Sequence, residues 1–146
     1  MSTPSQYFSS PDEAEQAFYE AFERADLEAM MAVWADEDDV ICIHPGGPRL
    51  LGLAAVRASW RSIFFEGPRL SARMAATRVM QGATLSVHST EEHLSLADDP
   101  QTRQIALATN VYLRGKNGWR MVMHHASPLP ESTEQDEPEE APRTLH

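Results

Sequence analysis

The pattern of apolar and polar positions changes its period about halfway along the chain. In the first half, apolar residues recur every three or four positions, which predicts helices with one buried face. The first helix begins at Ser10, where the sequence Ser-Pro-Asp-Glu supplies an N-cap, a proline at the first helical position and a capping box. A second helix begins at Asp26, and a third begins after Gly52 and ends at Gly67.

The second half is dominated by strand-forming residues and predicts an antiparallel meander of four strands. The expected strands cover residues 70–80, 83–96, 103–114 and 119–127. A short apolar strand, Val40–Ile43, precedes them and ends at His44-Pro-Gly-Gly, where proline and glycine should stop any further pairing. This order predicts an α+β fold, in which three N-terminal helices pack on a strongly curved, mostly antiparallel sheet and leave a cavity open at one end.

The last hairpin sets the register of the predicted cavity. Asn117-Gly118 between two strand-like runs is the sequence signal of a two-residue type I′ turn. Counting back from such a turn places Asn110 opposite His125 on the inner face of the sheet. A loop one residue longer or shorter would turn His124 inward instead, since neighbouring strand residues point to opposite faces.

Charge and composition divide the chain into three parts. Six acidic residues and one arginine follow Pro128 and carry half of the net charge of −10. We expect residues 129–146 to be a disordered acidic tail, residues 1–9 a flexible N-terminus and residues 10–128 the folded domain.

Composition also narrows the class of protein. The folded part has no basic patch for nucleic acid, and the chain has neither a signal peptide nor an apolar run that spans a membrane, so we expect a cytoplasmic protein. Cys42, in an apolar run, is expected to be a core residue. Two histidines that could share a site are too few for a zinc centre, and we predict neither a metal nor a cofactor.

Several short motifs resemble the nuclear transport factor 2-like superfamily, and within it the SnoaL-like and ketosteroid-isomerase-like proteins. The resemblance covers residues 11–128 and implies a cone-shaped, cystatin-like roll around a cavity. The segments that carry it are DLEAMMAVWAD (26–36), His44-Pro-Gly-Gly, Gly52, Ser59-Trp60, Ala108-Thr-Asn, Gly118-Trp-Arg-Met and His124-His-Ala-Ser-Pro.

The resemblance also implies positions for catalytic groups. Ketosteroid isomerases carry a catalytic carboxylate before a proline at the end of the first strand, which is the position of His44 in this chain. Their second acid, a carboxyl that stays protonated at neutral pH, aligns with Asn110. Their oxyanion tyrosine aligns with Phe18, which has no hydroxyl; losing one such donor costs about 2.7–4 kcal/mol of transition-state stabilisation. Steroid isomerisation is therefore not expected.

We predict His44 as a general base and Asn110 with His125 as the groups that hold an oxyanion. For His44 the alternative is a turn histidine bonded to the backbone, and for Asn110 a buried amide that satisfies its neighbours. Glu91 and Glu92 are interpreted as a solvated edge. The residues expected to shape the pocket are Trp34, Trp60, Tyr112 and Met123.

These residues predict a cofactor-free enzyme of the isomerase, cyclase or dehydratase type that moves a proton on a small apolar carbonyl compound. One alternative is a non-catalytic ligand-binding or oligomeric assembly module of the same fold, and another is a helper domain that docks through its acidic tail. A homodimer is expected, because the outer sheet face is too apolar for water. The apolar residues expected on that face are Leu107, Val111, Leu113 and Val122.

Overall fold

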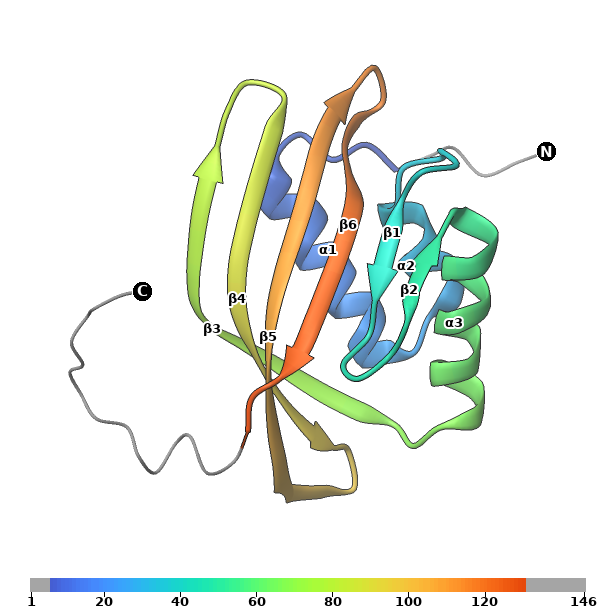
Figure 1. Ribbon diagram of the computed structural model, residues 1–146, viewed down its shortest axis with the longest axis vertical. Coiled ribbons are helices and arrows are strands. Elements are labelled where there is room, and N and C mark those ends of the chain that lie inside the picture. The colour runs from blue at the N-terminus through green and yellow to red at the C-terminus, as the bar shows by residue number, and fades with distance from the viewer. Residues whose placement is uncertain (1–5, 131–146) are drawn as a thin grey trace.

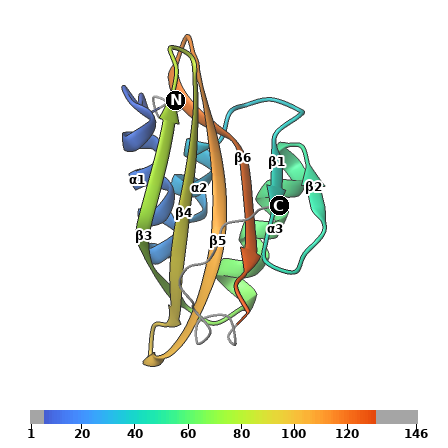
Figure 2. The same cartoon turned by 60° about the vertical axis from the view of Figure 1, so that its left-hand side comes forward.

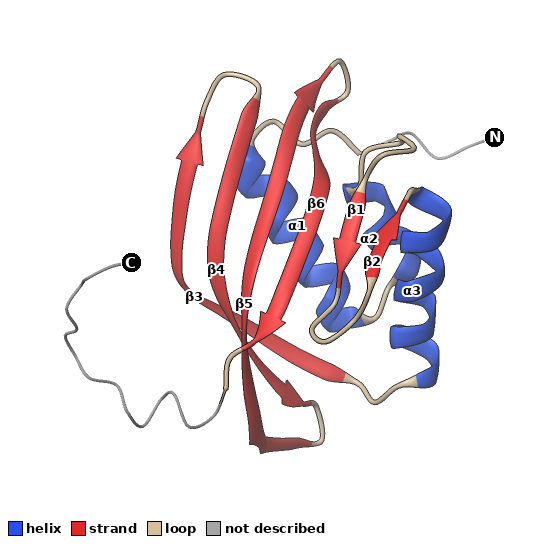
Figure 3. Cartoon of the chain, viewed as in Figure 1, coloured by secondary structure: helices blue, strands red, loops and turns tan. Residues whose placement is uncertain are grey.

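Three helices and one six-stranded sheet make up the part of the chain that this computed structural model describes, residues 6–130 (Figure 3). The predicted α+β class is confirmed. The helices are α1 (Pro11–Arg24), α2 (Leu27–Val33) and α3 (Leu53–Glu66). The strands are β1 (Ile41–Ile43), β2 (Arg49–Leu51), β3 (Leu70–Gln81), β4 (Leu85–Leu96), β5 (Asp99–Gly115) and β6 (Gly118–Pro128).

The sheet is mixed, in the order β2-β1-β6-β5-β4-β3, and only the β1–β6 pair is parallel among the described strands. The sheet is curved, and α1 lies against one of its faces while α3 lies beside β1 and β2 (Figures 1 and 2). The strand β2 was not predicted. The Pro-Gly loop after His44 does not end the pairing but closes a hairpin, in which Ile41 pairs with Leu51.

The predicted helix starts are confirmed at atomic detail. The Ser10 side chain accepts a hydrogen bond from the Glu13 amide at 3.1 Å, and the Asp26 carboxylate accepts one from the Ala29 amide at 3.0 Å. Gly52 caps α3 with a φ of +90°, a conformation that glycine adopts without strain.

The main core lies between the helices and the inner face of the sheet, and a smaller cluster of Ala106, Ala108 and Ala126 lies apart from it. The centre of the main core is aromatic, and Cys42 lies in it fully buried, as predicted. Burial raises the pKa of the Cys42 thiol to about 12, which makes it inert as a nucleophile. Within the described residues, every helix is too short or too polar to cross a membrane.

The predicted register of the last hairpin is wrong. The turn residues are Lys116 and Asn117, with Gly115 paired to Gly118, and Asn117 lacks the positive φ that a type I′ turn requires. A second irregularity follows between Val111 and Tyr112, where β6 has one extra residue. Because of both changes, Asn110 pairs with His124 and not with His125.

The N-terminal segment differs in part from the expected flexible tail of residues 1–9. Phe8 is buried, and its carbonyl accepts a hydrogen bond from the Trp119 amide at 2.9 Å beside the turn of the last hairpin. Residues 1–5 and the predicted acidic tail from residue 131 onward lie outside the described residues.

Gly118→Ala is expected to destabilise the protein by about 2 kcal/mol or more. Gly118 has a φ of +88°, and an added Cβ would lie 2.6 Å from the Phe8 carbonyl oxygen. Gly115→Ala, at the other end of the same turn, is the matched control because its Cβ would meet open space. Urea unfolding of both variants measures the difference, and equal stabilities would contradict the prediction.

Candidate active site

A cavity of about 240 Å³ lies between α1, α3 and the inner face of the sheet. Most of its wall is apolar, with aromatic rings contributed by Phe18, Phe22 and Trp60. The polar side chains in the wall are Tyr19, His44, Glu92 and His124. A largely apolar hollow with a few convergent polar groups is the usual form of a small-molecule site.

Trp60 forms the centre of the aromatic wall. Its ring centroid lies 5.6 Å from that of Phe18, 4.7 Å from that of His44 and 6.1 Å from that of His124. The Phe18 and His44 rings meet it edge to face, an arrangement that aromatic quadrupoles favour. Trp60 is therefore both a core residue and part of the cavity wall.

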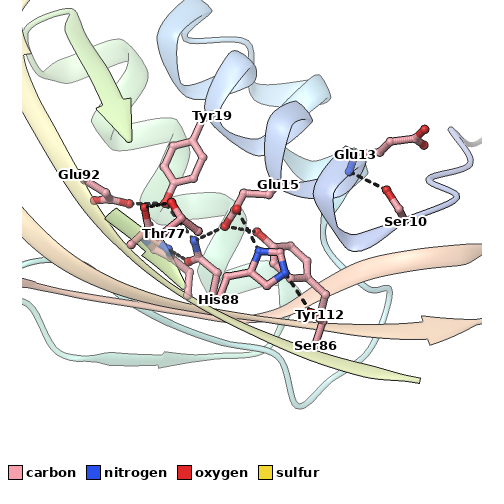
Figure 4. Close-up of polar contacts among 12 residues, drawn as sticks. Ser10, Glu13, Glu15, Tyr19, Thr77, Ser86, His88, Glu92 and Tyr112 are labelled. Atoms are coloured by element: carbon pink, nitrogen blue, oxygen red, sulfur yellow. Dashed lines mark hydrogen bonds and ion pairs between the residues drawn. The ribbon is translucent and has the colours of Figure 1, made fainter. Parts of the chain in front are cut away.

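Glu92 is buried in the cavity wall with only 5% of its surface exposed. The prediction that Glu92 lies on a solvated edge is therefore wrong, because the even-numbered residues in this part of β4 are buried on the side that faces α1. The Tyr19 hydroxyl, which reaches from α1, donates to Glu92 Oε2 at 2.6 Å (Figure 4). Burial raises the pKa of the Glu92 carboxyl to about 7, against the opposing effect of the Tyr19 hydrogen bond, and the nearby Glu15 charge adds to the increase.

His124 takes the place that the sequence analysis assigned to His125. Its Nδ1 lies 2.6 Å from Asn110 Oδ1, and only 3% of the residue is exposed. Burial, with smaller contributions from His44 and His125, lowers the pKa of the His124 imidazole to about 3, so the ring is neutral at physiological pH.

Asn110 connects three of these groups from beneath the cavity. Its amide nitrogen donates to the Tyr19 hydroxyl oxygen at 2.9 Å and to Glu15 Oε2 at 3.1 Å. Both amide hydrogens are thus engaged, and the amide oxygen accepts from His124. In this arrangement Asn110 orients Tyr19 and His124 and keeps no hydrogen for a ligand.

His44 lies in the cavity wall on the same side of the sheet as His124, with their ring centroids 6.4 Å apart. Its Nε2 is 3.0 Å from Ser59 Oγ and 3.6 Å from Cys42 Sγ. Burial lowers the pKa of His44 to about 4, so this imidazole too is neutral at physiological pH.

Four residues predicted for the site lie elsewhere. His125 is exposed on the opposite face of β6, and Met123, which pairs with Val111 in the sheet, shares that face. Trp34 is buried in the core beside β6. Tyr112 is fully buried and donates to Glu15 Oε2 at 3.2 Å. The bulge in β6 explains the first two differences, because one extra residue exchanges the faces of all later side chains.

Glu15 also belongs to a second polar cluster outside the cavity (Figure 4). His88 Nδ1 lies 2.9 Å from Glu15 Oε1, and His88 Nε2 lies 2.9 Å from Ser86 Oγ. This is the connectivity of a nucleophile triad, but Ser86 and His88 are completely buried and neither lines the cavity described above. The cluster therefore anchors α1 to the sheet.

Sequence reasoning missed Glu15, Tyr19 and Glu92. One signal was available: Glu15 and Tyr19 are four residues apart on α1, beside the apolar stripe that faces the sheet. No group of three or more His, Cys, Asp or Glu side chains within residues 6–130 is arranged to hold a metal ion.

Helices covering a curved sheet around a cavity with polar residues define the nuclear transport factor 2-like class of α+β proteins. Solved members of this class with less than 25% identity share the fold, among them a nuclear transport factor 2-like protein of Salmonella enterica, with 17% identity, a TM-score of 0.71 and coverage of 82% of this chain and 89% of that one. Within the class, this chain belongs to the SnoaL-like domain family, which matches residues 12–131.

Two solved structures are similar in sequence as well. A candidate calcium/calmodulin-dependent protein kinase type II association domain of Thiobacillus denitrificans is 46% identical, with a TM-score of 0.81 over 86% of this chain and 99% of that one. A candidate dehydratase of the NTF2-like family from Streptomyces avermitilis is 32% identical, with a TM-score of 0.73 over 80% and 91%.

A plant protein is also related in sequence. The F-box protein SKIP8 of Arabidopsis thaliana is 29% identical over 103 residues, or 69% of this chain. The matched region spans 42% of the length of that relative.

Proposed function

We propose that the protein binds a small, largely apolar molecule in the cavity and transfers a proton on it, as an isomerase- or dehydratase-type enzyme without a cofactor. The observation that carries this proposal is the buried Glu92 carboxyl in the cavity wall, with a pKa of about 7. A general acid or base works best when its pKa lies near the working pH, because both of its protonation states are then available.

The neighbouring imidazoles, His44 and His124, are suited to be the second proton-transfer group that such a reaction needs. His124 and His44 are held neutral by burial, so each offers a ring nitrogen that can accept a proton or a hydrogen bond. The role of general base that we predicted for His44 stays a prediction. With a pKa of about 4 it is a weaker base than Glu92, so Glu92 is the primary proton carrier in this proposal.

Similarity to the candidate dehydratase of Streptomyces avermitilis supports the reaction class, since that chain is 32% identical and covers most of this one. The ketosteroid isomerase mechanism is not proposed. Tyr19, which comes from α1 as the isomerase tyrosine does, donates its only proton to Glu92 and has none for an oxyanion.

Replacing Glu92 by Gln tests the proposal. With a panel of small cyclic ketones and hydroxyketones as substrates, the Glu92→Gln variant should lose about 10²–10⁴-fold in turnover. The matched control is Glu91→Gln, because Glu91 is the preceding residue of β4, points to the opposite face and contacts His93. Turnover that survives in Glu92→Gln at the parental rate would refute the assignment of Glu92.

A non-catalytic assembly module is the second candidate. Leu107 and Leu113 on the outer face of the sheet are 44% and 40% exposed, and this face would serve a homodimer. The relative of Thiobacillus denitrificans carries the name of an association domain. Ligand binding by parent and Glu92→Gln alike, with turnover by neither, would favour this candidate. The cytoplasmic location stays a prediction.

A further inference from the structure

The direction of each hydrogen bond beneath the cavity follows from Glu15. Carboxylate oxygens only accept, so the Asn110 group that lies 3.1 Å from Glu15 Oε2 must be the amide nitrogen. The Asn110 oxygen therefore points the other way, to His124 Nδ1 at 2.6 Å. Glu15 itself lines an outer groove between α1 and β3 and does not line the cavity.

The Asn110 oxygen fixes the tautomer of His124. Because this oxygen only accepts, the His124 Nδ1 atom carries the ring proton, and in a neutral imidazole the Nε2 atom is then a lone-pair acceptor. Within residues 6–130, Nε2 has no hydrogen-bond partner, although the residue is only 3% exposed and its ring lies in the cavity wall. Trp34 Nε1, Trp60 Nε1 and Arg120 Nη1 are the buried side-chain atoms without a partner in this part of the chain, and His124 Nε2 is not among them. Nε2 therefore keeps surface of its own in the cavity wall, where a ligand can give it the donor that it lacks.

The other polar groups around His124 offer a ligand few donors. Tyr19 accepts from Asn110 and gives its only proton to Glu92. Trp60 Nε1 is a donor without a partner among the described residues, but the atom is itself buried and is not open to a ligand. Ser59 Oγ gives its proton to the Val56 carbonyl and therefore accepts from His44 Nε2, so the neutral His44 ring has no second proton for a ligand. Only the Glu92 carboxyl, in its protonated form, can donate to a ligand among these groups.

We propose that the cavity selects its ligand by a hydroxyl group, which donates to His124 Nε2, and that Glu15 is the positioning residue that sets this preference from outside the cavity. The class of expected ligands is thereby narrowed from small carbonyl compounds in general to those that also carry a hydroxyl group. This inference rests on the proposed function in one respect, namely that the cavity binds a small molecule, and it requires no turnover.

A pair of shape-matched probes tests the ligand class. Calorimetric titration of the full chain with 1-tetralol and with 1-tetralone at pH 7 compares a hydroxyl with a carbonyl on one ring system. We expect the alcohol to bind at least about tenfold more tightly, because the ketone oxygen would face a second acceptor and leave it unsatisfied. Equal or tighter binding of the ketone, or binding of neither probe, would overturn the assignment.

Nitrogen NMR of the ligand-free protein tests the tautomer directly. We expect His124 to carry its proton on Nδ1 at pH 7, and a proton on Nε2 or on both nitrogens would overturn the inference. This result does not depend on activity. A protein with the Nδ1–H tautomer and the alcohol preference but no turnover would refute the proposed reaction and leave the ligand assignment standing.

The variant Glu15→Gln tests the positioning role. A glutamine amide can donate to the Asn110 oxygen, which lets Asn110 turn over and moves the His124 proton to Nε2. We expect the alcohol preference to fall below about threefold and the Nε2–H tautomer to appear. Glu20→Gln is the matched control, because Glu20 lines the same outer groove of α1 without touching Asn110.

Unchanged tautomer and preference in Glu15→Gln would refute the role of Glu15. Should this variant fail to fold, the two measurements on the parent protein still decide the ligand class, since neither needs a substitution.

Discussion

Glu92→Gln is expected to be more stable than the parent protein at pH 8 and about equally stable near pH 4.5. The Glu92 carboxyl has a pKa of about 7 in the native state, whereas its ordinary value is 4.5. Between these two values the unfolded chain releases the proton while the native chain keeps it. The parent therefore loses stability as the pH rises from 4.5 to 7, and this loss is complete above pH 7.

The size of the effect follows from the width of that interval. The difference between the two pKa values corresponds to a loss of roughly 3 kcal/mol in the free energy of unfolding of the parent protein. The Glu92→Gln variant would not lose this stability, because a glutamine side chain does not ionise. Urea unfolding of parent and variant at several pH values between 4.5 and 8 measures it. Glu91→Gln, a change on the opposite side of the same strand, controls for the loss of one negative charge. A stability difference between parent and Glu92→Gln that does not grow with pH would show that Glu92 is ionised in the native state throughout.

Trp60→Ala should destabilise the protein by about 3–5 kcal/mol. Trp60 is the largest fully buried side chain among the described residues and packs on rings from α1, α3 and β6. Removing the indole takes away these contacts and enlarges the cavity that is already present. The neighbouring side chains therefore cannot move in to fill the space, which raises the cost of the substitution.

Thermal and urea unfolding measure the Trp60 effect. Phe65→Ala is the control, because Phe65 lies on the same helix with 61% of its surface exposed and should change stability by no more than about 0.5 kcal/mol. A loss below about 1 kcal/mol in Trp60→Ala would mean that the aromatic wall is not the structural centre described above.

The helices and the order of the strands could be predicted because their signals are local. Ser10 and Asp26 cap their helices through atoms three residues away, and the spacing of apolar residues on α1 is a property of one continuous segment. The strand β2 was missed because its three residues pair only after the loop that follows His44 has turned the chain back.

The site was predicted in part. His44 and Trp60 lie in the cavity wall, and the expected pairing of Asn110 with a histidine is correct in kind. The wrong histidine was chosen because the turn begins one residue earlier and β6 contains a bulge. The earlier turn shifts the pairing by two residues and leaves the faces of β6 unchanged, whereas the one extra residue of the bulge exchanges the faces of all later residues in that strand.

Local chemistry thus decided where the helices and the longer strands lie, whereas the pairing of β2 and the inward face of β6 were decided by the tertiary structure. The acid–base character of the site was decided by contacts across the fold. Glu92 looks like a surface residue until Tyr19, 73 positions earlier, covers it, and only the docking of α1 on the sheet removes the water that would hold its pKa near 4.5. A pKa depends on everything that surrounds a group, and those surroundings exist only once the chain has folded.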